Sequence, residues 1–105
     1  MKLTEKCKED FEKWYLIFIM SKKGRTNLMY STYIEWFYQL PQSMQYGVYV
    51  DFFDSVGIRL ECIYDSYSSN EWYVGINCIS QKGSFKLRTD ARTEAITKAN
   101  EIYNK

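Results

Sequence analysis

The sequence contains no histidine, a single proline and no long run of apolar residues. Histidine is the commonest metal ligand and the commonest general base near neutral pH, so its absence argues against a metal site and against an enzyme. The longest apolar run extends only from Trp14 to Met20, whereas a helix needs roughly 20 such residues to cross a bilayer. Because the N-terminus also lacks a signal-peptide pattern, we expect a cytoplasmic, non-enzymatic protein that binds neither a cofactor nor a membrane.

The sequence also contains few cysteines, and its net charge is small. The three cysteines include no CxxC pair, which argues against a disulfide framework and against a thiolate zinc site. Lysine and arginine total 14 against 13 acidic residues, and the formal net charge is +1, so no global field draws the chain toward nucleic acid. Hydrophobic residues, in contrast, make up 46% of the chain and aromatic residues 18%. This composition predicts one well-packed domain over residues 1–105.

Two helices are predicted in the N-terminal part of the chain. Apolar residues at three- and four-residue spacing predict a helix from Glu5 to Met20, with Thr4 as its N-cap. Thr32 and Glu35 have the spacing of a capping box and predict a shorter helix from Tyr33 to Gln39. The polar residues between the two helices, with their glycine, predict a loop.

Two more helices are predicted further along. The first runs from Pro41 to Val56, with Gly57 as a left-handed cap. Its apolar side chains occupy about two-thirds of the helix circumference, so we expect the other elements to enclose it on nearly all sides. The last helix begins at a cap formed by Thr89 or Asp90, and its evenly spaced alanines permit close approach to a sheet.

Between these two helices the apolar period changes to two, which predicts three strands. Ile58 to Asp65 and Trp72 to Cys78 supply the first two, and Phe85 with Leu87 supplies the third after a turn at Gln81 to Gly83. The sequence therefore predicts an α+β fold in the order helix, helix, helix, strand, strand, strand, helix. The strands form a three-stranded antiparallel meander packed against the helices.

The register of this meander follows from keeping the apolar faces together. That condition places Cys62 opposite Val74, and Cys78 opposite Phe85 across the second turn. Cys62 and Cys78 are then too far apart for a disulfide. We expect both to be buried as free thiols.

Several stretches carry a resemblance to a known group of proteins. They are Leu40-Pro41, Ser43 to Tyr49, Asp51 to Ile58, Ala91-Arg92, Ala95-Ile96 and Lys98 to Tyr103. Together they resemble small bacteriophage- and prophage-encoded proteins of uncharacterised function, over most of the chain from Phe11 to Tyr103. The resemblance brings no activity with it. It implies a mobile-element origin and a bacterial cytoplasm, where short accessory proteins act by binding a host or defence component.

Leu16, Ile17 and Met20 are a candidate partner-binding site, because they point away from the apolar face of the first helix. The alternative is that the short helix around Trp36 and Phe37 covers them. Burial by a partner could be homodimeric or heteromeric.

Lys22, Lys23, Arg25 and Tyr30 are a candidate nucleic-acid site, since the cations can contact phosphates and the ring can stack on a base. The alternative is a solvated connection, because the chain has no recognised nucleic-acid motif.

Asp51 and Asp54 lie three residues apart on the polar stripe of the third helix, and a carboxylate pair can take part in acid–base or metal chemistry. One helix turn supplies two metal ligands at most, however, and no third group is fixed by spacing. We therefore interpret these residues as a structural ion pair with Arg92, at the edge of the last helix's apolar face.

Taken together, these features favour a non-enzymatic protein-binding accessory factor of phage or mobile-element origin, with interference with a host or defence component as one candidate role. Two alternatives stay open. The first is a nucleic-acid-binding protein that uses the loop from Lys22 to Arg25. The second is a small-ligand binding or sequestering protein, in which the many tyrosines and tryptophans line a pocket for a planar, nucleotide-like molecule.

Overall fold

The computed structural model describes residues 1–23 and 30–105, and the side chains of residues 1–20 and 31–105. The elements are α1 (Glu5–Lys23), α2 (Tyr30–Gln39), α3 (Gln42–Ser55), β1 (Leu60–Asp65), β2 (Glu71–Ile76), β3 (Ile79–Ser80) and α4 (Arg88–Tyr103). The three strands form one antiparallel sheet in the order β1-β2-β3. The predicted α+β fold and the predicted order of its elements are therefore confirmed.

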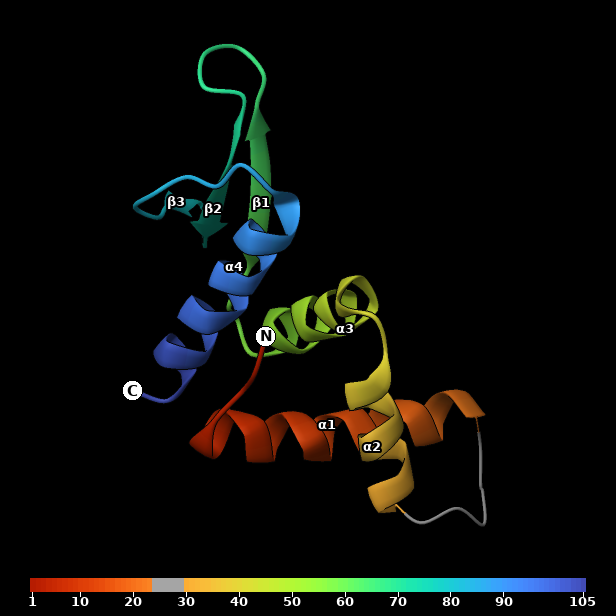
Figure 1. The fold of residues 1–105 in the computed structure, drawn as a ribbon. Coiled ribbons are helices and arrows are strands. Elements are labelled where there is room, and N and C mark those ends of the chain that lie inside the picture. The colour runs from red at the N-terminus through yellow and green to blue at the C-terminus, as the bar shows by residue number, and fades with distance from the viewer. Residues whose placement is uncertain (24–29) are drawn as a thin grey trace.

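The molecule is elongated, with principal extents of 53 × 28 × 20 Å. Figure 1 shows α1, α2 and α3 grouped at one end and the sheet at the other. Helix α4 packs against β1, β2 and α3, and so connects the two ends. Its alanines Ala91, Ala95 and Ala99 are completely buried, which confirms that they permit the close approach of helix to sheet.

The interior of the helical end consists of aromatic rings packed around Phe11 of α1. The Phe11 ring is completely buried and lies 5.1 Å from the ring of Phe37 in α2 and 4.9 Å from that of Tyr49 in α3, measured between centroids. Trp14, Tyr15 and Phe52 complete its surroundings at 5.4–6.0 Å. At these separations and tilted geometries, aromatic pairs attract one another beyond the burial of their area. A single side chain thus joins three helices.

The C-terminal helix caps the N-terminal one through two asparagines. Thr4 precedes α1 as predicted, but the Cys7 amide donates its hydrogen bond to the side-chain Oδ1 of Asn104, at 2.8 Å. The buried Asn100 side chain accepts from the Thr4 amide and donates to the Thr4 hydroxyl, both at 2.9 Å. These bonds satisfy donors that the first turn of a helix leaves unpaired, and they attach α4 to α1.

Helices α1 and α2 are both longer than predicted. Helix α1 continues through Lys23 and α2 begins at Tyr30, so Thr32 and Glu35 lie inside α2 and the predicted capping box is wrong. The cause is that serine and lysine are tolerated within a helix and provide no signal to end one. The rest of the predicted loop, residues 24–27, lies outside the described residues.

The ends of α3 are close to the prediction, since Pro41 precedes it, Val56 follows it and Gly57 has a φ of +82°. The expectation of near-complete enclosure is wrong, because Met44 and Val56 are exposed. Gln45 is buried instead, and its side-chain amide donates to the carbonyls of Tyr38 and Leu40 at the end of α2. The apolar pattern of this helix therefore did not predict that a polar side chain, that of Gln45, is buried in it.

At the other end of the chain, α4 begins at Arg88 after Leu87, and no side-chain hydrogen bond caps it. The predicted caps Thr89 and Asp90 therefore lie within its first turn. Leu87 is exposed and ends no strand, contrary to the prediction.

The register between β1 and β2 is confirmed, with Cys62 opposite Val74. The second turn was placed wrongly. Asn77 and Cys78, with φ values of +52° and +67°, make a two-residue turn, so Cys78 is exposed rather than buried opposite Phe85. Asparagine tolerates this left-handed backbone, but the glycine that usually follows it in such hairpins is missing here.

The segment predicted as the third strand makes only one isolated bridge to the sheet, in which Phe85 pairs with Trp72. Cys62 is half-buried, and all three cysteines are free, as expected.

Replacement of Asn100 by alanine tests the link between α4 and α1. We expect Asn100→Ala to lower the free energy of unfolding by about 1–3 kcal/mol, because the Thr4 amide loses its acceptor in a partly buried place. Urea denaturation measures the change. Thr97→Ala, on the exposed side of the same helix, is the matched control and should change the free energy by less than about 0.5 kcal/mol. Equal effects of the two substitutions would contradict the capping role.

Candidate functional site

An apolar groove lies between α1 and α2. It has a volume of about 180 Å³ and is lined by Tyr15, Ile19, Tyr33, Trp36, Phe37 and Leu40. Tyr15, Tyr33 and Phe37 are buried and form its floor, whereas Ile19 is half-buried and 52% of Trp36 is exposed. Among the described side chains, no charged group lines the groove.

The predicted partner-binding residues continue this groove around α1. Successive residues of a helix are about 100° apart. Leu16 and Met20 therefore lie about 60° and about 100° around α1 from Ile19, and Ile17 lies about 160° from it, on the far side of the helix. Leu16 is half-buried, Met20 is exposed, and Ile17 is 70% exposed. We call Leu16, Ile17, Ile19, Met20 and Trp36 the α1–α2 surface.

The alternative that α2 covers Ile17 and Met20 is wrong. Phe37 turns inward, with its ring 4.9 Å from that of Tyr15. Trp36 turns outward, packs edge-on against Tyr33 at 5.9 Å and forms part of the groove. The sequence pattern had placed Trp36 in the short helix that would cover α1, and it had not singled out Ile19. Only the packing angle of the two helices decides which of these residues face outward.

The predicted nucleic-acid residues lie at the junction of α1 and α2. Lys22 and Lys23 are the last residues of α1, and Tyr30 is the first of α2. Arg25 lies outside the described residues, as do the side chains of the other three. The nucleic-acid hypothesis therefore stays a prediction.

The predicted ion pair between Arg92 and the aspartates of α3 is wrong. The guanidinium of Arg92 lies over the ring of Tyr46, 5.3 Å from its centroid, while Asp51 and Asp54 are exposed. Within the described residues, the ion pairs closer than 4.0 Å join other side chains of α1 and of α4. The reason is that Tyr46 is held in place, with its hydroxyl 3.4 Å from the Cys62 sulfur, and offers Arg92 its aromatic face.

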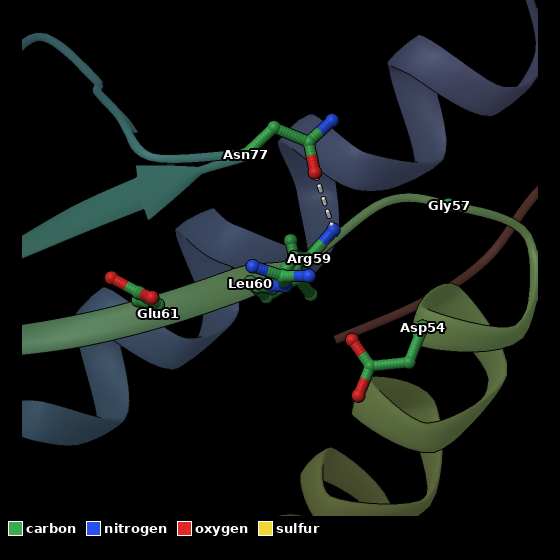
Figure 2. A pocket seen from close by; sticks show the side chains of 6 residues that line it. All are labelled: Asp54, Gly57, Arg59, Leu60, Glu61 and Asn77. Atoms are coloured by element: carbon green, nitrogen blue, oxygen red, sulfur yellow. Dashed lines mark hydrogen bonds between the residues drawn. The ribbon is translucent and has the colours of Figure 1, made fainter.

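A more polar pocket lies where α3 leads into β1. Figure 2 shows its lining of Asp54, Gly57, Arg59, Leu60, Glu61 and Asn77. Its volume is about 420 Å³, and the Asn77 side chain accepts a hydrogen bond from the Arg59 amide at 2.8 Å. No aromatic ring lines this pocket, so it cannot stack a planar ligand in the way that the small-ligand alternative requires. Across residues 1–20 and 31–105, no three histidine, cysteine, aspartate or glutamate side chains lie together as a metal site would need.

The loop at the tip of the β1–β2 hairpin is ordered by Asp65. One carboxylate oxygen accepts from the amides of Tyr67 and Ser68 at 3.0 and 3.3 Å, and the other accepts from the Ser68 hydroxyl at 2.7 Å. The Ser68 hydroxyl, followed by the two amides, lowers the pKa of Asp65 to about 2. The ionised carboxylate is therefore part of the loop structure.

Comparison with known proteins found no match to this chain among family models, curated proteins or solved structures. The resemblance to phage proteins therefore stays a prediction. None of the described helices is long and apolar enough to span a membrane.

The contribution of Asp65 should depend on pH. Its pKa is about 2 in the folded chain, below its ordinary value of 3.8, so the ionised form stabilises the fold above about pH 4. That stabilisation is lost as the pH falls through 2. We expect Asp65→Asn to be less stable than wild type at pH 6, and we expect the difference to shrink between pH 4 and pH 2.

Thermal unfolding at several pH values measures this dependence. Asp54→Asn is the control, since it makes the same change at an exposed aspartate outside the hairpin loop. A difference between wild type and Asp65→Asn that stays constant from pH 6 to pH 2 would contradict the role given to the carboxylate.

Proposed function

We propose that this chain is a non-enzymatic protein-binding accessory factor of phage origin, and that its partner docks on the α1–α2 surface. The supporting observations are the exposure of Trp36 beside a groove lined by aromatic and aliphatic side chains, and the exposure of Met20 and Ile17 further around α1. Contiguous apolar side chains on a small protein lose their unfavourable contact with water only when something covers them.

The dimensions of the groove favour a protein segment over a small molecule. Ligand pockets commonly have volumes of about 300–1,000 Å³, and this groove has about 180 Å³, which suits a single large side chain. Tryptophan is typical of the residues that contribute most to protein interfaces. The groove lining contains no charged side chain among the described residues, as is typical of an interface core. The partner is then a segment, such as an amphipathic helix, that inserts an apolar side chain between α1 and α2.

The cellular role follows from the resemblance to phage proteins. A short accessory protein in a bacterial cytoplasm acts by occupying a surface of a host or defence component, and needs no cofactor to do so. The α1–α2 surface supplies the contact. Because the net charge of the chain is only +1, recognition of the partner depends on the local shape of this surface.

Capture from a bacterial lysate with three forms of the tagged chain tests this function. We expect wild type to retain one protein from the lysate. Ile17→Glu should retain at least about tenfold less of that protein, because a carboxylate would be buried in an apolar interface without a partner. Ile79→Glu is the matched control, since Ile79 is 68% exposed and lies in β3, at the other end of the molecule.

The retained protein is then purified and its affinity measured directly. Ile17→Glu should weaken binding at least about tenfold, and Ile79→Glu should leave it unchanged, with equal melting temperatures for all three chains. Equal affinity of Ile17→Glu and wild type would remove the α1–α2 surface from consideration. Retention that disappears after nuclease treatment and weakens steeply with salt would favour the nucleic-acid alternative instead.

A further inference from the structure

The tip of the β1–β2 hairpin is uncovered on both faces and at its end. Figure 1 shows the hairpin loop projecting beyond α4, away from the three N-terminal helices. Ile63 and Tyr64 are both exposed, and because neighbouring residues of a strand point to opposite faces, they lie on opposite sides of the hairpin. Tyr67, in the loop itself, is completely exposed. Apolar groups therefore surround the tip rather than forming one flat patch.

The loop that carries Tyr67 is held in one conformation before any partner binds. Asp65 accepts the two amides and the hydroxyl described above, as well as the Ser69 hydroxyl at 3.2 Å. Ser69 in turn accepts from the Tyr73 hydroxyl at 3.0 Å. Association is costly when a loop must be ordered in the process, and here that ordering is already complete. A rigid loop of tyrosine, serine and asparagine is also the chemistry that antibody loops use.

The charge of the hairpin indicates what kind of surface it fits. Residues 60–76 contain the carboxylates of Glu61, Asp65 and Glu71, and no lysine or arginine. The guanidinium of Arg88 lies over the Trp72 ring, 4.3 Å from its centroid, so the carboxylates still outnumber the cation on the hairpin. Such a segment repels the phosphates of nucleic acids and anionic lipids. It is attracted by a positively charged protein surface.

We infer that the tip of the β1–β2 hairpin is a second recognition site, which inserts Tyr67 into a concave, positively charged surface of a partner protein. A concave surface is required because the exposed residues lie on both faces of the tip and at its end, so that a flat surface would cover only some of them. This site lies at the opposite end of the molecule from the α1–α2 surface and does not depend on it.

Site-specific photocrosslinking tests the inference. The probe is p-benzoylphenylalanine in place of Ser66, which is exposed beside Tyr67, and the labelled chain is irradiated in a bacterial lysate. We expect one nuclease-resistant protein adduct. An excess of unlabelled wild-type chain should suppress it at least about tenfold, and the same excess of Tyr67→Ala chain should not. Because Tyr67 is completely exposed, Tyr67→Ala should keep the wild-type melting temperature.

Two further competitors sharpen the result. Asp65→Asn chain should compete less well than wild type, because its loop is less ordered. Ile17→Glu chain should compete as well as wild type, because its hairpin is intact, and this separates the hairpin site from the α1–α2 surface. The inference is overturned if no adduct forms, if the adduct is sensitive to nuclease, or if Tyr67→Ala competes as well as wild type.

Discussion

The packing of aromatic rings around Phe11 is the interaction on which the rest of the structure depends. It joins α1 to α2 and α3, and it even buries the hydroxyl of Tyr49, for which the described residues provide no hydrogen-bond partner. An unpaired buried hydroxyl costs about 1–3 kcal/mol. Phe11 alone makes five ring contacts, each worth about 0.5–1.5 kcal/mol beyond its buried area. Ring packing therefore outweighs the cost of the hydroxyl.

This packing also determines which side chains remain outside. Because Tyr15 and Phe37 turn toward Phe11, Trp36 and Ile17 are left exposed. The sheet end is organised by α4 and by the Asp65 turn. Helix α4 joins this end to α1 through the two asparagines and through the Tyr103 hydroxyl, which donates to the Asp10 carboxylate at 2.6 Å. Both proposed recognition sites thus lie near the ends of a molecule 53 Å long. If both proposals hold, one chain can hold two protein surfaces at a fixed separation.

Much of the fold could be predicted because it follows from local periodicity. The change from a helical to an alternating apolar pattern located the first two strands, and matching the apolar faces gave the pairing of Cys62 with Val74. The turn at Asn77 was missed because cysteine follows it where glycine is usual. The ends of α1 and α2 were missed because lysine and serine do not terminate a helix.

The candidate sites depend on contacts that no local pattern contains. Periodicity indicated that Ile17 faces away from the core, but the outward turn of Trp36 follows from how α2 packs on α1. The sequence suggested Asp51 or Asp54 as the partner of Arg92, but the Arg92 guanidinium lies over the ring of Tyr46 instead. The hairpin tip gave no signal at all, because its serines and asparagine are typical of any turn and the hydrogen bonds that order it appear only in three dimensions.

The most direct test of the central role of Phe11 is the free energy of unfolding of Phe11→Ala, compared in urea with that of Ile102→Ala, an apolar change at an exposed position of α4. We expect Phe11→Ala to lose about 3–5 kcal/mol and Ile102→Ala less than about 1 kcal/mol. A loss below about 1 kcal/mol for Phe11→Ala would contradict the claim that its ring holds the three helices together.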